Sequence, residues 1–264
     1  MNAPVILYHR IDGDGEPLLL LNGVAMSVAA WEDIARQFAE SFRVVRCDFR
    51  GQLMMPVTVP DVADHAKDVV ALMDYLELDT AHLLGTSFGG VVATMVAGRH
   101  PDRVLSLTTV ASAPGFYDEM ADEVELWKAA CRRSLDGGDR GHLSDVLDPI
   151  IFSRAYTESH KEERTMRRAQ IAALPDVWFE GLYGLLDSAH SLRLQGELEA
   201  IQCPTMVIAA ELDAFVPLAR ARDLAESIGG ARFEVVKGAG HAVVMEQAQR
   251  VVDLCLDFLE PLER

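Results

Sequence analysis

Residues 85–90 read Gly85-Thr86-Ser87-Phe88-Gly89-Gly90, directly after the short apolar run His82-Leu83-Leu84. Residues 88–99 follow with helical period, so the stretch predicts a strand, a sharp turn and a helix, with the pattern Gly-x-Ser-x-Gly in the turn. The glycines let the chain close tightly around a serine in a strained conformation. Such a turn lifts the Ser87 hydroxyl above the sheet at a helix N-terminus, where the helix dipole favours negative charge. The stretch therefore predicts a nucleophilic serine.

Ser87 needs a base, because a serine hydroxyl is a poor nucleophile until its proton is taken. Among the eight histidines, His241 has the expected setting. It follows the apolar strand predicted at residues 232–236 through the short, flexible link Lys237-Gly238-Ala239-Gly240. His241 is therefore the candidate base, and an ordinary histidine in a surface loop is the alternative explanation.

The third member of a triad should follow the preceding strand. That strand is predicted at residues 205–209, and Asp213 lies just past its last apolar position, with Glu211 as the weaker alternative. The order Ser87, Asp213, His241 is the one that accompanies a strand–turn–helix nucleophile. We therefore predict a Ser-Asp-His triad, although Ser87 alone could cap its helix and Asp213 alone could form a turn.

Short apolar runs alternate with longer segments of helical period along most of the chain. This alternation indicates parallel strands joined by right-handed crossovers, and therefore an α/β sheet with helices on both faces. The predicted strands are residues 18–21, 43–47, 82–84, 104–110, 205–209 and 232–236, and the predicted helices are residues 31–38, 62–76, 88–99, 219–228 and 247–259.

Residues 115–199 do not fit this alternation, because they contain no convincing buried strand. They are typical of several helices broken by Gly137-Gly138, Pro149 and Pro175. We predict a helical cap inserted between two strands of the sheet. The predicted division is a core of residues 1–114 and 200–264 and a cap of residues 115–199, in a single structural unit overall.

The elbow pattern and the triad order resemble the α/β-hydrolase fold family over nearly the whole chain. Leu20-Leu21-Asn22-Gly23-Val24 matches the segment where that family usually carries His-Gly-x. The resemblance implies a mostly parallel, doubly wound sheet and an oxyanion hole formed by the backbone N–H groups of Val24 and Phe88. Such donors stabilise the oxygen that gains charge in the tetrahedral intermediate.

Residues 48–51, Asp48-Phe49-Arg50-Gly51, resemble the family's Asp-x-Arg-Gly segment. The chain then departs from the family, because Gln52-Leu53-Met54-Met55-Pro56 stands where His-Gly-x-Ser is usual. That loop borders the site in the family, so Met54 and Met55 are candidates to face the substrate. Ordinary core packing is the alternative for both.

The nucleophile and nearby residues indicate which branch of the α/β-hydrolase fold family the chain resembles. Haloalkane dehalogenases and epoxide hydrolases of this fold carry aspartate at the elbow, so Ser87 argues against both. C–C hydrolases of meta-cleavage pathways usually carry Trp after the catalytic histidine, whereas this chain has Ala242. Residues 21–31 and 42–46 are more similar to 3-oxoadipate enol-lactonases, which also place Asn at the position of Asn22.

The chain has 264 residues, and its 24 Lys and Arg against 41 Asp and Glu give a formal net charge of −17. Nucleic-acid binding draws affinity from neutralising phosphates, so the negative surplus argues against nucleic acid and against anionic membranes. No apolar run approaches the roughly 18 residues of a spanning helix, and the N-terminus lacks a signal-peptide pattern. We expect a cytoplasmic monomer or homodimer that acts on a small molecule.

The four cysteines, Cys47, Cys131, Cys203 and Cys255, are far apart and form no Cys-x-x-Cys pair. Free thiols are therefore expected in place of disulfides. No group of His, Cys and Asp has the spacing of metal ligands. We expect neither a metal nor a cofactor.

The predicted cap holds a high share of the aromatic residues, and two or three of them should line an apolar acyl pocket. Arg164, Arg167 and Arg168 lie at helical spacing in the cap. A solvated face is the ordinary explanation for these arginines, and a receptor for a carboxylate is the alternative. The predicted pocket residues are Asn22, Met54, Met55, Phe116, Trp127 and Trp178.

These observations predict a serine hydrolase that cleaves a small-to-medium carboxylic ester or lactone through an acyl-enzyme on Ser87. His241 would take the serine proton, and Asp213 would hold the imidazole in the required tautomer. Because a fold does not determine a reaction, an acyltransferase or a cofactor-independent lyase or oxygenase on the same triad is the first alternative. A receptor that binds a ligand without turnover is the second.

Overall fold

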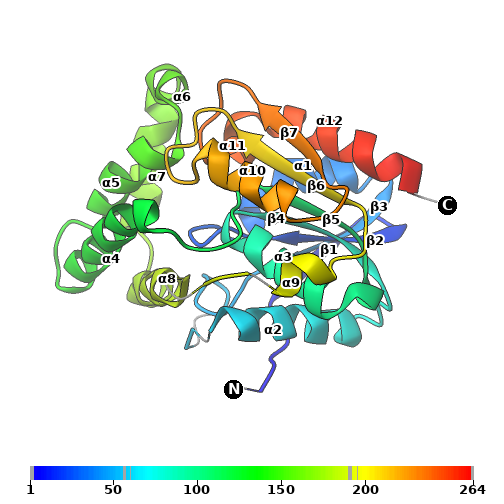
Figure 1. Ribbon diagram of the computed structural model, residues 1–264. Helices are drawn as coiled ribbons and strands as arrows, with labels where there is room; N and C mark the ends of the chain where they lie inside the picture. The colour runs from blue at the N-terminus through cyan, green and yellow to red at the C-terminus, as the bar shows by residue number, and fades with distance from the viewer. Residues whose placement is uncertain (1–2, 56–57, 60, 190–191, 195, 263–264) are drawn as a thin grey trace.

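A seven-stranded sheet forms the centre of the computed structural model, which describes residues 3–55, 58–59, 61–189, 192–194 and 196–262 (Figure 1). The strand order is β1-β3-β2-β4-β5-β6-β7, and all neighbours are parallel except β1, which is antiparallel to β3. This confirms the predicted mostly parallel, doubly wound sheet. The strands are β1 (His9–Asp12), β2 (Glu16–Leu21), β3 (Phe42–Cys47), β4 (Ala81–Thr86), β5 (Val104–Val110), β6 (Thr205–Ala210) and β7 (Arg232–Val236).

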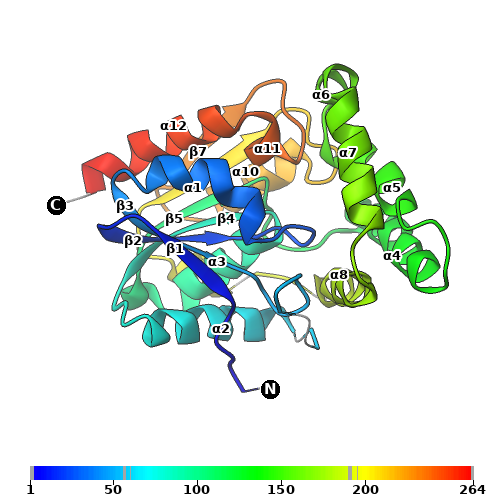
Figure 2. The ribbon, with the colours of Figure 1, turned by 180° about the vertical axis from the view of Figure 1, so that it is seen from behind.

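Helices cover both faces of the sheet (Figures 1 and 2). Alternate residues of β2 enter opposite cores: Leu18 and Leu20 pack on one side, and Leu19 and Leu21 on the other. A strand that is buried on both faces is apolar at successive positions, which explains the run of four leucines. One layer contains α1 (Glu32–Phe38) and α12 (Ala248–Leu259), and the other contains α2 (Val62–Tyr75), α3 (Phe88–Arg99), α9 (Gly196–Ala200) and α10 (Leu218–Glu226).

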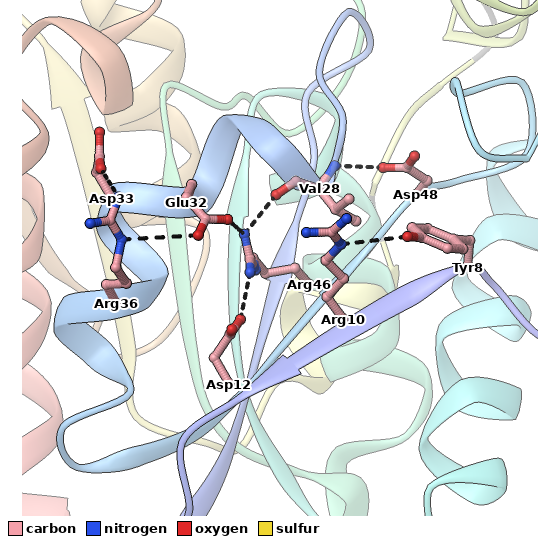
Figure 3. Close-up of polar contacts among 9 residues, drawn as sticks. All are labelled: Tyr8, Arg10, Asp12, Val28, Glu32, Asp33, Arg36, Arg46 and Asp48. Atoms are coloured by element: carbon pink, nitrogen blue, oxygen red, sulfur yellow. Dashed lines mark hydrogen bonds and ion pairs between the residues drawn. The ribbon is translucent and has the colours of Figure 1, made fainter.

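Strand β1 was not among the predicted strands. It is a short edge strand whose residues are half-buried or exposed, so it lacks the apolar signal of the central strands. The buried guanidinium of Arg46 ties it to the core, because it pairs with Asp12 of β1 at 2.6 Å and with Glu32 of α1 at 2.7 Å (Figure 3). Arg46 also donates to the Val28 carbonyl at 3.1 Å, so one side chain joins β1, β3 and the start of α1.

Between β5 and β6 the described chain contains helices but no strand, and helices α4–α8 gather at one end of the sheet in both views (Figures 1 and 2). They are α4 (Ala121–Leu135), α5 (His142–Ile151), α6 (Arg154–Ser159), α7 (Lys161–Ala172) and α8 (Asp176–Ser188). Further short elements of the described chain are α11 (Val243–Glu246) and 3-10 helices at Val28–Trp31, Pro101–Arg103, Asp118–Met120 and Glu260–Leu262.

Two expectations about this segment need correction. Pro149 does not break a helix, because it lies inside α5, where the helix continues for only two residues and loses one backbone hydrogen bond. Residues 196–199, assigned to the cap, belong to α9, which lies against α3 in a layer that covers the sheet. A Cβ on Gly98 would come within 2.3 Å of the Glu197 carbonyl oxygen, so the two helices meet at a glycine.

The four cysteines are free thiols, as expected, with three of them buried and Cys203 half-buried. Burial raises the pKa of the Cys131 thiol to about 12, so this group stays protonated at neutral pH. Among the described residues, no helix has the length and apolar character needed to cross a bilayer.

Candidate active site

Ser87 occupies a sharp turn between β4 and α3. Its backbone has φ 51° and ψ −118°, a conformation that a residue with a side chain adopts only under strain. The turn depends on two glycines. A Cβ on Gly85 would lie 2.2 Å from the Gly89 carbonyl oxygen, and a Cβ on Gly89 would lie 2.2 Å from the Leu21 carbonyl oxygen. The glycines of the Gly-x-Ser-x-Gly pattern are therefore required by close backbone approach.

The structure brings Ser87, His241 and Asp213 together in one hydrogen-bonded chain. Ser87 Oγ lies 2.9 Å from His241 Nε2, and His241 Nδ1 lies 2.9 Å from Asp213 Oδ2. The three residues follow β4, β7 and β6, and the carboxyl ends of parallel strands meet at the same edge of a sheet. With Nδ1–H donating to the carboxylate, Nε2 is left to accept the serine proton.

The Asp213 carboxylate is almost completely buried, with 2% of its side chain exposed. Its second oxygen, Oδ1, accepts hydrogen bonds from the backbone N–H groups of Phe215 at 2.9 Å and Val216 at 2.7 Å. The other candidate, Glu211, lies elsewhere: its exposed carboxylate accepts from the Gly238 N–H at 2.8 Å. Of the two acidic residues, Asp213 is therefore the one that contacts His241.

The two backbone N–H groups predicted to form an oxyanion hole are those of Val24 and Phe88. The Phe88 N–H is the first of α3 and so has no acceptor within the helix. Val24 lines both cavities that open at Ser87, and within the described residues its N–H has no acceptor. Donors that are held ready in this way are suited to an oxygen that becomes charged during a reaction.

Two cavities meet at Ser87. Both are lined by Val24, Trp127 and Phe215 in addition to the serine. The first has a volume of about 550 Å³, mouth included, and reaches from Phe88 toward α4 and α8. The second, of about 610 Å³ by the same measure, is bordered by His241 and reaches toward α5 and α7. Ser87 therefore borders two compartments, one that reaches toward α4 and α8 and one that reaches toward α5 and α7.

Comparison with known proteins assigns the family. A sequence model described as alpha/beta hydrolase fold matches residues 16–248. The chain belongs to the α/β hydrolase fold family. A pimeloyl-[acyl-carrier protein] methyl ester esterase from Aeromonas hydrophila is 28% identical over 257 residues, which cover 94% of this chain and 96% of that protein. A 2-hydroxymuconate semialdehyde hydrolase from Pseudomonas sp. is 29% identical over 262 residues, covering 94% and 88%.

Solved structures of other α/β hydrolases have the same fold. The enol-lactonase from Burkholderia xenovorans superposes with a TM-score of 0.84 at 26% identity, over 96% of each chain. An alpha/beta hydrolase from a deep-sea metagenome library gives a TM-score of 0.89 at 20% identity, over 96% of this chain and 94% of the other. These comparisons confirm an enzyme that hydrolyses esters or related substrates.

Four of the predicted pocket residues do not line the two cavities at Ser87. Asn22 is buried in a polar network, where it accepts from Trp31 Nε1 and donates to Asp48 and Gln52. The other three lie outside both cavities: Met54 is 47% exposed, Met55 packs on the core, and Trp178 packs edge-on to Phe179. Phe116 lines the first cavity and Trp127 lines both.

Sequence reasoning missed Gln52, which stands where the family usually has His. Its Nε2 donates to the Gly23 carbonyl at 2.8 Å, and its Oε1 accepts from Asn22 Nδ2 and from the Phe49 N–H, each at 2.8 Å. The Asp48 carboxylate completes this network, and burial raises the pKa of that carboxyl. This network holds the loop that carries Val24. The sequence signal for it was the replacement of the family's usual His by Gln52.

A second feature that sequence reasoning missed is a contact between the His241 loop, residues 237–242 together with the start of α11, and the inserted helices, which are α4–α8 between β5 and β6. The Ala242 N–H donates to the Ile151 carbonyl at 2.7 Å, and the Glu246 carboxylate accepts from Ser153 at its N–H (2.6 Å) and its hydroxyl (2.7 Å). The chains approach so closely that a Cβ on Gly240 would lie 2.6 Å from the Ser153 nitrogen. No local pattern marks such a contact, since its partners are about 90 residues apart in sequence.

Proposed function

We propose that this α/β hydrolase is a serine hydrolase that cleaves a small-to-medium carboxylic ester or lactone through an acyl-enzyme on Ser87. The observation that carries the proposal is the chain of two 2.9 Å contacts from Ser87 Oγ through His241 to Asp213, beside the N–H groups of Val24 and Phe88. A nucleophile, a base, an orienting carboxylate and oxyanion donors are the groups that acyl transfer requires.

The mechanism follows from this geometry. Ser87 Oγ attacks the substrate carbonyl while His241 Nε2 takes its proton, and the carbonyl oxygen becomes an oxyanion held by the two backbone N–H groups. The bond from the carbonyl carbon to the leaving-group oxygen then breaks as His241, charged and stabilised by Asp213, gives its proton to that oxygen, which leaves an acyl-enzyme on Ser87. A water molecule, deprotonated by the same imidazole, attacks the acyl carbon; the bond to Ser87 Oγ breaks, His241 returns the proton to Oγ, and the carboxylic acid is released.

The cavities and the relatives support a small ester or lactone. The first cavity is lined by apolar side chains apart from Ser87 and Ser112, so it suits an apolar acyl group. The methyl ester esterase and the enol-lactonase are similar to this chain over nearly their whole lengths. We further propose that helices α4–α8, which supply Trp127, Leu186 and other lining residues, act as a cap that closes both compartments over Ser87.

A fluorophosphonate probe tests the proposal without knowledge of the substrate. The probe should label Ser87 alone, as mapped by mass spectrometry, and Ser87→Ala should abolish the labelling. Ser112→Ala is the matched control, because this serine lines the same cavity but donates its hydroxyl to the Ser87 carbonyl. Folded protein that resists a small probe would rule out the acyl-enzyme mechanism.

Product analysis then separates hydrolysis from acyl transfer. Release of the acid from a panel of esters and lactones in buffer supports a hydrolase. Transfer of the acyl group to an added alcohol, in strong preference to water, would favour the acyltransferase alternative on the same triad.

A further inference from the structure

The two cavities at Ser87 differ in charge. The described side chains that line the first cavity are all uncharged. Among those that line the second, Arg167 is the one permanent charge, and His241 is the other titratable group. Because His241 borders only the second cavity and returns its proton to the leaving alcohol, this compartment is the one that receives the leaving group.

Arg167 is held at this cavity by two contacts. Its Nε donates to Asp148 Oδ1 at 3.0 Å, and its guanidinium lies 5.3 Å from the centre of the Phe152 ring. The Asp148 carboxylate is buried, with 2% of its side chain exposed, and also accepts from the Ser144 hydroxyl at 2.8 Å. A planar guanidinium fixed through Nε and one ring face has a defined orientation.

The terminal amino groups of Arg167 have no protein partner within the described residues. Two acidic side chains of neighbouring segments have other partners: Glu246 accepts from Ser153 through both oxygens, and Glu163, one turn before Arg167 on α7, accepts from the Tyr156 hydroxyl at 3.2 Å. The two amino groups of an arginine form an edge that matches the two oxygens of a carboxylate. Because Arg167 contacts Asp148 through Nε, its two terminal amino groups stay available to bind a carboxylate.

The neighbouring arginine shows the contrast. Arg168 lies on the surface of α7 and pairs with Asp139 and Asp145, as expected for a solvated face. It does not line either cavity. The two adjacent arginines of α7 therefore differ in setting, because Arg168 lies in surface ion pairs and Arg167 lines a cavity.

We propose that Arg167 is a specificity-determining residue that binds a carboxylate on the leaving group of the substrate. The inference rests on the proposed function, since the two compartments are assigned through the roles of Ser87 and His241. The preferred substrate class is an ester that joins an apolar acyl group to a hydroxy acid. Its acyl group occupies the first cavity, and its carboxylate meets Arg167 in the second.

Two esters of equal shape test the proposal: para-carboxyphenyl butyrate and para-carbamoylphenyl butyrate, which is neutral. The ratio of their kcat/KM values, carboxylate over carboxamide, should fall about tenfold or more in Arg167→Gln, because a charge-assisted pair is lost. Arg167→Lys should retain part of the preference, since it keeps the charge without the paired donors. Arg168→Gln is the matched control on the same helix and should keep the wild-type ratio.

Removal of Arg167 leaves the buried Asp148 carboxylate without its ion-pair partner, which destabilises the fold. The folding of each variant is therefore checked separately from its activity. Thermal unfolding and fluorophosphonate labelling of Ser87 are measured for each variant. If Arg167→Gln does not fold, the double variant Arg167→Gln/Asp148→Asn removes both charges and should show the same fall in the ratio.

The outcomes distinguish this proposal from the proposed function. Hydrolysis of both esters with a ratio that Arg167→Gln leaves unchanged would overturn the carboxylate site and leave the serine hydrolase standing. Failure of Ser87 to react with the probe, together with no hydrolysis of either ester, would overturn the hydrolase. In that case calorimetry with para-hydroxybenzoate and para-hydroxybenzamide tests the site directly. Arg167-dependent preference for the carboxylate supports it, and equal binding overturns it.

Discussion

Gln52 Nε2 donates to the carbonyl oxygen of Gly23 at 2.8 Å, in the peptide group that also carries the N–H of Val24, a residue that lines both cavities at Ser87. The same carboxamide accepts from the Phe49 N–H, so it spans two loops that follow neighbouring strands. A buried side chain that satisfies groups on both loops restricts their relative movement. Gln52 is therefore expected to position the Val24 N–H, which we propose as an oxyanion donor.

Replacement of Gln52 by Leu should slow fluorophosphonate labelling of Ser87 and lower kcat by about tenfold or more, because one misplaced oxyanion donor costs that much or more. Gln249→Leu is the control, since Gln249 is exposed on α12 and its side chain donates to Asp253 on the same helix. A Gln52→Leu protein with a lower melting temperature but an unchanged labelling rate would show that Gln52 contributes to stability alone.

Gly89→Ala should destabilise the protein by about 3 kcal/mol or prevent folding. Its new Cβ would lie 2.2 Å from the Leu21 carbonyl oxygen, and backbone atoms cannot move aside cheaply. Gly229→Ala is the matched substitution, because no described atom beyond its two chain neighbours lies within 4 Å of its Cβ position. Urea unfolding of both variants measures the difference, and equal stabilities would show that the elbow tolerates a side chain.

Glu246→Gln should loosen the contact between the His241 loop and the inserted helices. The carboxylate accepts two hydrogen bonds from Ser153, and loss of its charge should cost about 1–2 kcal/mol. Hydrogen exchange should become faster at residues 151–156 and at the His241 loop. The exposed pair Arg154–Glu158 offers a control, because Glu158→Gln leaves the contact intact. Unchanged exchange in Glu246→Gln would contradict the assigned role.

His65 should make the protein less stable in mild acid. Burial lowers the pKa of this histidine to about 3, and neither ring nitrogen has a hydrogen-bond partner within the described residues. The unfolded chain takes up a proton near pH 6.5, whereas the folded chain resists protonation, so stability is lost as pH falls from about 6.5 toward 3.

Between pH 7 and pH 5 this one group should cost about 2 kcal/mol of unfolding free energy. His65→Leu should be correspondingly less sensitive over the same interval, as measured by urea unfolding at both pH values. The centre of the His65 ring lies 5.3 Å from the ring centres of Phe49 and Phe88, so the substitution also changes packing. For this reason, only the change in unfolding free energy between the two pH values is compared. An equal loss of stability in both proteins would contradict the buried neutral state.

The central strands were predictable from sequence because both of their faces are buried. Residues 104–110 carry an uninterrupted apolar and small-residue pattern, and they form β5 with the predicted bounds. Strand β1 was not predictable, because an exposed edge strand with polar residues has no such pattern. Pro149 was misjudged for a related reason, since the effect of a proline depends on how far the helix continues beyond it.

The sequence alone suffices for the fold and for the order of the triad candidates, because Ser87, Asp213 and His241 each follow their own strand and parallel strands end at one edge of the sheet. It does not suffice for the lining of the cavities. Arg167, Trp127 and Phe215 come from α7, from α4 and from the loop after β6. Helical period shows which residues share a face, but only packing in three dimensions determines which face meets Ser87 and which meets water.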